Sequence, residues 1–145
     1  MIVEIGSNNE DLRLDDIQEM LSKVFWCPRI TRNEILKGIK NSALVVGAYT
    51  ERGKQIGFLR VVSDKVRFAY LLDAVVHEDY RKQGIGQRMV KCALSHPELK
   101  DVYQWFLRTR DAGGVYEKCG FGPLKNPEKW MSIINPRPDR ADFVG

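Results

Sequence analysis

The sequence predicts an α/β fold in which a mixed β-sheet carries helices on both faces. Strand-like and helix-like segments follow one another in the order β-α-α-β-β-β-α-β-α-β, and this alternation is typical of layered α/β architectures. Between residues 66 and 109, a strand, a helix and another strand succeed one another, which indicates a right-handed crossover. No repeat, linker or low-complexity segment divides the 145 residues, so we expect one domain.

Composition and charge are those of an ordinary soluble domain. Hydrophobic residues make up 43% and charged residues 29% of the chain, and the net charge is +4. This charge is too mild, and the basic residues too scattered, to indicate a nucleic-acid partner. The apolar runs are too short to span a membrane, and the first residues lack a secretory signal pattern. We therefore expect a cytoplasmic protein with no membrane or nucleic-acid partner.

The cysteines and histidines do not indicate a metal site. Cys27, Cys92 and Cys119 are odd in number and widely spaced, with no CxxC motif and no clustered histidines. We therefore expect neither disulfides nor a bound metal, and idle or buried thiols. His77 and His96 stand in loop and helix-end contexts, where we expect surface side chains.

The first thirty residues predict a strand and a helix. Residues 2–5 alternate weakly, as a short strand does. Ser7 with Glu10, or alternatively the acidic pair at 15–16, could begin the helix. Helix-spaced apolar residues then form one stripe: Ile17, Met20, Leu21, Val24 and Phe25. The helix is expected to end at "WCPR", because the residue before a proline disfavours helical geometry.

A second helix and a hairpin follow. Thr31 with Glu34 makes a capping-box pattern for the helix. Its inner side is expected to carry Ile35, Leu36 and Ile39. Residues 43–49 and 55–62 then read as two strands joined by the turn "TERGK".

A long apolar run and a third helix form the middle of the chain. Residues 66–76 follow a tight turn, and the part "FAYLLDAVV" does not alternate, so we expect both of its faces to be covered. The helix after it ends near His96 and Pro97. Its apolar stripe comprises Ile85, Met89, Val90, Ala93 and Leu94.

The C-terminal part predicts two more strands around a short helix. Residues 102–109 and 130–134 read as strands. Residues 114–118 read as a helix that Gly120 ends in a left-handed conformation. From about residue 135 the chain is expected to form an extended tail.

The stretch "EDYRKQGIGQRM", residues 78–89, is typical of a phosphate-binding loop. Two close glycines let the backbone approach a ligand, and the helix that begins there offers unpaired N–H groups and a positive dipole end. The nucleotide-binding pattern GxxxxGK[ST] is absent. The dinucleotide pattern GxGxxG also fails, because Met89 replaces its third glycine.

The loop fits the pattern [RQ]-x-x-G-x-[GA] with Arg81, Lys82, Gln83, Gly84, Ile85 and Gly86. With "VVHEDY" before it and "GVYEKCGF" at residues 114–121, the chain resembles the GNAT superfamily of acyl-CoA N-acyltransferases from the first helix to the last strand. The resemblance implies a central, mostly antiparallel sheet with one splayed parallel pair. It also implies acetyl-CoA as cosubstrate and no metal.

The resemblance implies where the cofactor binds. In the family, main-chain amides of the loop hold the coenzyme A pyrophosphate; here they belong to Gln83, Gly84, Ile85 and Gly86, with Arg81, Lys82 and Gln87 nearby. The strand end formed by Val75 and Val76 would lend its backbone to the pantetheine arm, as an added strand does. Thr109 stands where the family often has an asparagine that contacts the cofactor.

Acetyl transfer needs a donor for the developing oxyanion and a proton for the departing sulfur. By resemblance, the Val76 amide polarises the thioester carbonyl and Tyr116 protonates the thiolate. The acceptor amine would attack directly in a ternary complex, without a covalent enzyme intermediate.

The general base is less well defined. Many family members have a glutamate at the position of Tyr70, and a tyrosine is no base at neutral pH unless it is strongly perturbed. Asp73 is the only carboxylate in the run 68–76, so it is a candidate for the amine anchor or for a base acting through water. As a structural alternative, Asp73 pairs with Arg67 or Arg108.

The acceptor is expected to be a small molecule with a primary amine. Trp26 and Arg29 follow the first helix, where the family often shapes its acceptor site, and Tyr70 and Asp73 would complete it. Because the family glutamate is missing at Tyr70, the alternative prediction is that the protein is a non-catalytic acyl-CoA-binding or sensor module. A homodimer is compatible with the resemblance, since related folds are often dimers.

Overall fold

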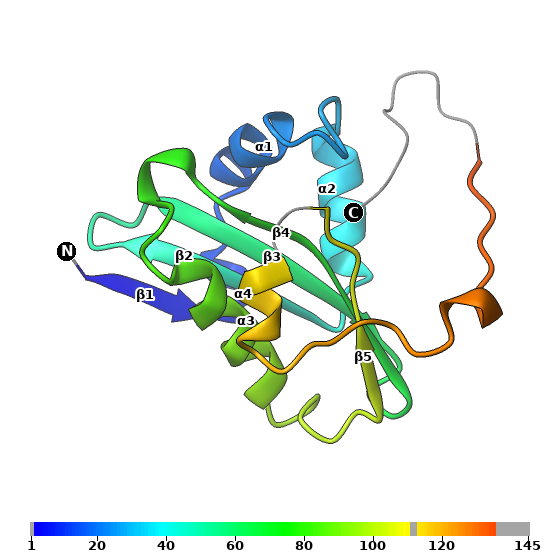
Figure 1. The fold of residues 1–145 in the computed structure, drawn as a ribbon. Helices are drawn as coiled ribbons and strands as arrows, with labels where there is room; N and C mark the ends of the chain where they lie inside the picture. Colours follow the sequence, from blue (N-terminus) through cyan, green and yellow to red (C-terminus); the bar gives the residue numbers. More distant parts are fainter. Residues whose placement is uncertain (1, 111–112, 136–145) are drawn as a thin grey trace.

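A five-stranded mixed sheet organises the molecule (Figure 1). The computed structural model describes residues 2–110 and 113–135. The strands follow the order β1-β2-β3-β4-β5, and neighbours pair antiparallel except for the parallel pair β4–β5. Their bounds are Val3–Gly6, Leu44–Thr50, Gln55–Ser63, Phe68–Val76 and Gln104–Phe106. The predicted mixed sheet with one parallel pair is therefore confirmed.

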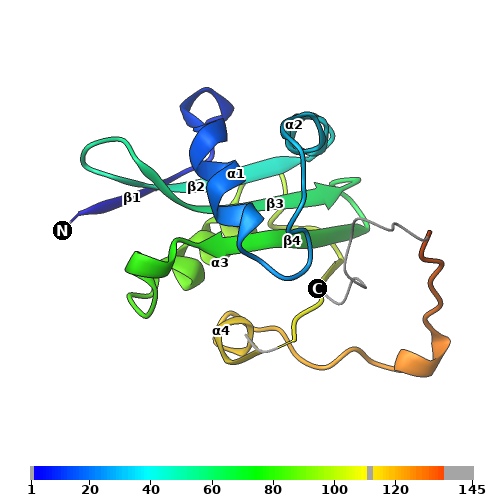
Figure 2. The ribbon, with the colours of Figure 1, turned by 90° about the horizontal axis from the view of Figure 1, so that it is seen from above.

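Helices cover both faces of this sheet, as the sequence predicts (Figure 2). α1 and α2 lie on one face, and α3, which connects the parallel strands, lies on the other. The helices are α1 (Leu14–Ser22), α2 (Arg32–Lys40), α3 (Ile85–Ser95) and α4 (Gly113–Glu117). Short 3-10 turns are η1 (Asn9–Asp11), η2 (Glu78–Tyr80) and η3 (Pro127–Lys129).

Each face of the sheet has its own hydrophobic core. The core under α3 contains four of the five helix residues predicted to face inward: Ile85, Met89, Val90 and Ala93. The core on the opposite face is formed by the helix residues Ile17, Met20, Leu21 and Ile35. The sheet is thus held between two apolar layers, and only its edges remain for polar chemistry.

The first helix is shorter than its apolar stripe suggests. α1 begins at Leu14 with the acidic pair 15–16 in its first turn, the second of the two predicted starts. It ends at Ser22, one turn before the predicted end. Val24 is still buried beyond that end, whereas Phe25 is only half-buried and makes an edge-to-face contact with Trp26.

α2 carries the predicted capping box. The Thr31 side chain accepts from the Glu34 amide, and the Glu34 carboxylate accepts from the Thr31 amide. Ile35 is buried and Ile39 packs beside it, since residues four apart lie on one face of a helix. The prediction that Leu36 faces inward is wrong: its side chain lies about 100° further round the helix and is 49% exposed.

β4 contains a bulge that the apolar run conceals. Phe58 pairs with Val75 and Arg60 with Leu72, so β4 has one more residue than β3 between these pairs. Asp73 sits in the bulge with a φ of +58°. The lack of alternation in this strand therefore comes from the bulge, and the predicted cover on both faces is incomplete, since Phe68 is 37% exposed.

The C-terminal part differs from its prediction. The strand expected over 102–109 narrows to β5 because only Gln104–Phe106 pairs with β4. The short helix α4 and its left-handed end at Gly120 are confirmed. Residues 130–134 form no strand, since within the described chain they pair with none of the five strands of the sheet. Of the predicted tail, residues 136–145 lie outside the described residues.

Gly57 allows α3 to approach β3 closely. A Cβ atom at this position would lie 2.8 Å from the Met89 sulfur and 2.9 Å from the Ala48 Cβ. We expect Gly57→Ala to lower the free energy of unfolding by about 1–3 kcal/mol, the usual cost of overpacking a core. Gly6→Ala is the matched control, since nothing lies within 4 Å of its Cβ position. Urea denaturation measures both, and equal midpoints would contradict the close approach.

Candidate active site

An open cleft runs along β4 where its parallel neighbour ends. The ladder between β4 and β5 stops at Tyr70 and Phe106, so among the described residues no strand pairs with the rest of β4 on that side. The cleft holds about 510 Å3 of empty space when the solvent at its open mouth is included. It is lined by residues 71–74 of β4, by Phe25 and Trp26, by residues 108–110 after β5 and by Tyr116 of α4. Four segments distant in sequence therefore converge on this part of β4.

The glycine loop lies at the C-terminal end of β4. Lys82 and Gly84 have φ values of +63° and +77°, and α3 begins directly after them. No side chain caps the first turn of α3. Nothing lies within 4 Å of a Cβ built on Gly84, so the loop leaves open space beside its main-chain amides. These features fit an anionic group such as a pyrophosphate.

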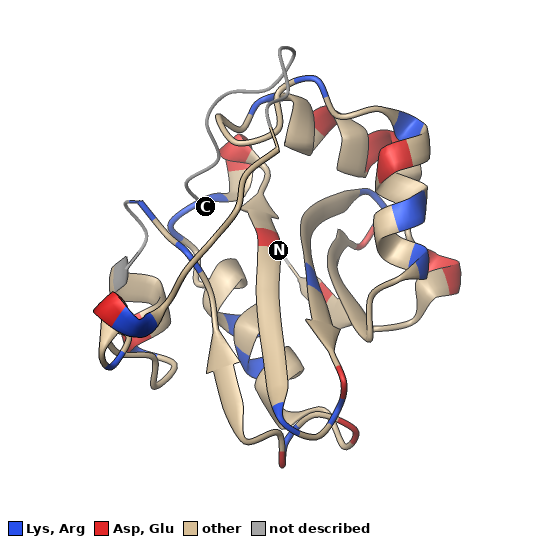
Figure 3. Ribbon diagram, turned by 90° about the vertical axis from the view of Figure 1, so that its right-hand side faces the viewer, with Lys and Arg blue, Asp and Glu red and all other residues tan. Residues whose placement is uncertain are grey.

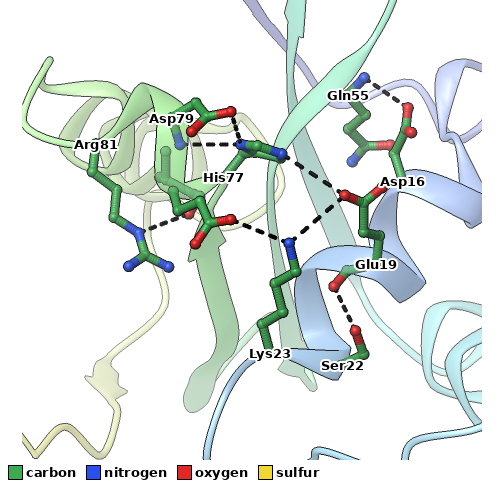
Figure 4. A network of polar contacts seen from close by, with 10 residues as sticks. Asp16, Glu19, Ser22, Lys23, Gln55, His77, Asp79 and Arg81 are labelled. Atoms are coloured by element: carbon green, nitrogen blue, oxygen red, sulfur yellow. Dashed lines mark hydrogen bonds and ion pairs between the residues drawn. The ribbon is translucent and has the colours of Figure 1, made fainter.

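A network of polar contacts ties α1 to this loop (Figure 4). Lys23 pairs with Glu78 at 3.2 Å and with Glu19 at 3.9 Å. The His77 ring accepts from the Asp79 amide at 3.1 Å, and its other nitrogen lies 3.9 Å from Glu19. The expectation that His77 is a surface residue is wrong, since only 8% of it is exposed. It fixes the turn that leads into the loop.

The backbone of Val76 points toward the open side of β4. The His77 amide donates to the Ile56 carbonyl of β3 at 2.8 Å. Successive residues of a strand direct their polar groups to opposite sides, so the N–H and C=O of Val76 face away from β3. The Arg81 guanidinium donates to this carbonyl at 3.1 Å. Val75 and Val76 line a smaller hollow with Arg81 and residues of α1.

Tyr116 projects from α4 into the cleft. Its ring packs on the α3 side of the sheet and meets Phe121 edge-to-face at 6.1 Å. The Gly120 and Phe121 amides donate back to Glu117 and Tyr116, which closes the helix end and holds the tyrosine in place. Burial, with a smaller contribution from Cys119, raises the pKa of Tyr116 above the ordinary tyrosine value. The hydroxyl is therefore protonated at neutral pH.

Asp73 is held by two donors. Its carboxylate accepts from the Arg60 Nε at 2.7 Å and from the Trp26 indole at 3.2 Å. Arg60 also lies 3.4 Å from the Ser42 hydroxyl. The predicted structural role of Asp73 is thus present with Arg60 of β3 as the ion-pair partner, because Asp73 sits in the bulge opposite β3. The Asp73 side chain is 11% exposed and the Arg60 side chain is 20% exposed.

Comparisons with known proteins agree with this geometry. A family model described as an acetyltransferase (GNAT) domain matches residues 41–123, more than half of the chain. The chain belongs to the GNAT acetyltransferase family. A crystal structure from Xanthomonas campestris pv. campestris, attributed to the same family, is 31% identical. The two match over 94% of this chain and 95% of that one, with a TM-score of 0.86.

More distant relatives point the same way. An uncharacterized N-acetyltransferase, ycf52 of Pyropia yezoensis, is 24% identical over 84% of this chain and 71% of its own length. A GNAT family structure from Streptococcus pneumoniae TIGR4 is 24% identical and covers 94% of this chain and 98% of that one. Its TM-score of 0.74 shows a shared fold.

The structure brings most of the predicted GNAT site residues to one side of β4. The loop from Arg81 to Gln87 lies at one end of that side, and Trp26, Thr109 and Tyr116 lie at the other, around Asp73. Two predicted acceptor residues stand apart. Arg29 is exposed and does not line the cleft. Tyr70 is not among the residues that line the cleft, and its ring stacks on Phe106 at 5.3 Å. Burial raises the pKa of Tyr70, so it is no base at neutral pH.

Three residues of this candidate site were missed from the sequence. Ala74 belongs to the bulge and lines the same cleft as Tyr116. Val76, the residue predicted from the sequence as the oxyanion donor, lines the neighbouring hollow instead. Phe25 forms one wall, and Arg60 neutralises Asp73 from β3. The only sequence signal for Ala74 was the break in alternation, and the pairing of Arg60 depends on strand register, which the sequence does not encode locally.

Charged residues show no single dominant patch in the view of Figure 3. Lys and Arg alternate there with Asp and Glu over helices and loops. Within residues 2–110 and 113–135, no three His, Cys, Asp or Glu side chains are placed to hold a metal ion. None of the helices in the same ranges is both long and apolar enough to cross a membrane.

The Arg60–Asp73 pair is testable by stability. We expect Arg60→Met to lower the free energy of unfolding by about 3 kcal/mol, because it leaves a mostly buried carboxylate without its cation. Asp73→Asn in that background should recover most of the loss, since asparagine is neutral and tolerates a positive φ. Arg67→Met is the matched control on the exposed surface. Chemical denaturation measures all variants, and equal losses for Arg60→Met and Arg67→Met would contradict the role of the pair.

Proposed function

We propose that this protein is an acetyl-CoA-dependent N-acetyltransferase that acts on a primary amine by direct attack in a ternary complex. The observation that carries the proposal is the open side of β4. It begins at a glycine loop suited to a pyrophosphate and ends in a cleft that contains a protonated tyrosine. Family membership supports acetyl transfer in general.

The loop and β4 would hold the cofactor by main-chain groups. The amides from Gln83 to Gly86 at the start of α3 suit the pyrophosphate, with the charge of Arg81 and Lys82 beside them. The outward C=O of Val76 suits an amide N–H of the pantetheine arm. Arg81 would then release the Val76 carbonyl and turn toward the phosphates. When bound, acetyl-CoA supplies the acetyl group as a thioester.

The developing negative charge on the acetyl oxygen needs an N–H donor in the cleft. The Val76 amide faces the open side of β4 and stays our predicted donor. Ala74 is a second candidate, favoured by its place in the bulge within the same cleft as Tyr116. A positioned donor of this kind is typically worth ~3–4 kcal/mol of barrier.

Tyr116 would protonate the departing sulfur. In the proposed step the neutral amine nitrogen bonds to the acetyl carbon, the carbon–sulfur bond breaks, and the Tyr116 proton goes to the thiolate. The nitrogen then loses its extra proton to solvent, and Tyr116 takes a proton from solvent, which restores the starting state of the enzyme. The raised pKa of Tyr116 keeps this proton in place at neutral pH. Thr109, which lines the same cleft, would contact the cofactor near the tyrosine.

Asp73 would anchor the acceptor amine. Two of its lone pairs are engaged by Arg60 and Trp26, and a carboxylate can accept about four hydrogen bonds. Its free positions would receive the ammonium proton of the acceptor, directly or through a water, and release a neutral nucleophile. Trp26 would form the wall of the acceptor site.

The proposed acceptor is a small amine. We propose no nucleic-acid or membrane partner for the protein, and its cytoplasmic location stays a prediction from the sequence. Relatives with named acceptors act on unlike amines. A histone acetyltransferase of Glycine max is 28% identical over 60% of this chain, and an Arabidopsis thaliana structure of glucosamine-6-phosphate N-acetyltransferase shares the fold with a TM-score of 0.70. A panel of grouped amines is therefore the appropriate screen, with thiol release as the readout.

Cofactor binding is tested by calorimetry with acetyl-CoA. We expect Gly84→Ala to weaken binding at least about tenfold, or ~1.4 kcal/mol, because a Cβ strains the positive φ and fills the cradle. Gly53→Ala is the matched control, since Gly53 has a φ of +84° in the distant β2–β3 turn. No binding by the unaltered protein would refute the cofactor assignment. Binding without thiol release on any amine would favour the sensor module.

The acid role of Tyr116 is tested by steady-state kinetics. We expect Tyr116→Phe to lower kcat by roughly 10²-fold or more, with little change in acetyl-CoA affinity. Tyr103→Phe is the control, because Tyr103 is 88% exposed and far from the chemistry. The raised pKa of Tyr116 also predicts that its acid form persists above the ordinary tyrosine value of about 10. An unchanged kcat in Tyr116→Phe would remove this residue from the mechanism.

A further inference from the structure

The cleft beside β4 is lined by an unequal set of charges. Among the residues that line it, the charged ones are Asp73, Arg108 and Arg110. Asp73 already pairs with Arg60, whose Nε lies 2.7 Å from its carboxylate. The two remaining cations both belong to the segment that follows β5. An acceptor bound in the cleft therefore meets two guanidinium groups as well as the carboxylate.

Arg110 is held by an aromatic ring. Its guanidinium carbon lies 3.7 Å from the centre of the Phe25 ring, so the segment after β5 contacts the segment after α1. Such stacking engages the flat face of the guanidinium, and its N–H donors point outward in the plane of the group. In that plane, a carboxylate or a phosphate accepts two parallel hydrogen bonds. The contact with Phe25 therefore orients Arg110 in a way that suits an anionic group.

Arg108 lies near Asp73 in the same cleft. Burial is the main cause of the raised pKa of Tyr70; the charge of Arg108 lowers that pKa, and the charge of Asp73 raises it. Both charges thus act on one hydroxyl, so the guanidinium and the carboxylate lie within interaction range of a common point. An acceptor that reaches Asp73 therefore also comes within range of Arg108.

We propose that the acceptor carries an anionic group, a carboxylate or a phosphate, in addition to its amine. Arg108 and Arg110 bind the anion while Asp73 holds the ammonium. Phe25 and Trp26, which line the same cleft, pack against the carbon skeleton between these two groups. The inference rests on the proposed acetyl transfer, and it narrows the acceptor from any small amine to one with a negative charge at a second position.

The charges of the cleft favour this class over a simple amine or a polyamine. The carboxylate of Asp73 is already paired with Arg60, so on its own it attracts an ammonium only weakly. The same ammonium is repelled by Arg108 and Arg110. An anionic group on the acceptor replaces this repulsion by attraction and adds charge-assisted hydrogen bonds, which are the stronger ones in proteins.

The cofactor has its own place for its pyrophosphate. The glycine loop suited to that group precedes α3, at the C-terminal end of β4. Arg108 and Arg110 line the cleft with residues 71–74, nearer the middle of the strand. The two arginines are therefore assigned to the acceptor and not to the pyrophosphate.

Selectivity between matched amines tests the proposal. Thiol release is measured with unbranched alkylamines, α,ω-diamines, ω-aminoalkanoates and aminoalkyl phosphates of graded chain length, and with α-amino acids against their amides. The best anionic amine should have a kcat/KM at least about tenfold above that of its uncharged match, and the diamines should be the poorest. Whether carboxylates or phosphates are preferred identifies the bound group. Uncharged amines or diamines that react as well as the anionic ones would overturn the proposal and leave acetyl transfer intact.

Charge substitution separates recognition from catalysis. Arg108→Gln and Arg110→Gln should each lower kcat/KM for the best anionic amine at least about tenfold, mainly through its KM, with the KM of acetyl-CoA unchanged. Arg110→Glu should shift the preference toward diamines, which a purely structural role would not do. Arg52→Gln is the matched control, since Arg52 is exposed in the turn between β2 and β3. Equal losses for charged and uncharged amines, or weaker acetyl-CoA binding, would overturn the assignment.

A binding measurement tests the anion site without acetyl transfer. Calorimetry of the full chain uses the same amines in the presence of excess coenzyme A, which carries no acetyl group. The best anionic amine should bind at least about tenfold more tightly than its uncharged match, and the double variant of Arg108→Gln and Arg110→Gln should remove the difference. If this difference is present but no amine releases thiol, the proposed function fails and the anionic ligand class stands. If the difference is absent, the anion site is refuted whether or not amines are acetylated.

Discussion

The loss of a strand partner beside β4 is the constraint on which the rest of the site depends. Up to Tyr70, β4 is paired on both sides; beyond it, β5 has ended and only β3 remains. A strand with one unpaired side must direct its outer N–H and C=O groups at solvent or at a ligand. The cleft, the hollow beside Val76 and the glycine loop follow one another along this side. A ligand that behaves as an added strand satisfies those groups.

The bulge in β4 shapes the centre of the cleft. One extra residue turns Asp73 toward Arg60 of β3 and leaves Ala74 at the cleft wall. The same carboxylate accepts from Trp26, so one residue joins β3, β4 and the connection after α1. Asp73 has a strained φ of +58°, which the surrounding contacts hold in place. Such strain is common where a fold positions reactive groups.

Polar contacts at the loop and apolar contacts in the cleft have separate tasks. Around His77, the half-exposed ion pairs of Lys23 link α1 to the turn that leads into the loop. Around Tyr116, burial keeps a hydroxyl protonated and oriented. In the proposed mechanism, main-chain amides at the rim would receive the anion, and Tyr116 at the sheltered end would transfer the proton.

The sequence by itself determined what is encoded locally. Helical spacing gave the inward face of α3, the capping box of Thr31 and Glu34 gave the start of α2, and the two glycines gave the loop before α3. Only the tertiary structure decided which residue neutralises Asp73, why the apolar run of β4 fails to alternate, and that residues 130–134 stand unpaired. The physical reason is that strand register and strand partners are set by contacts between segments far apart in the chain. A sequence pattern records only the alternation within each strand.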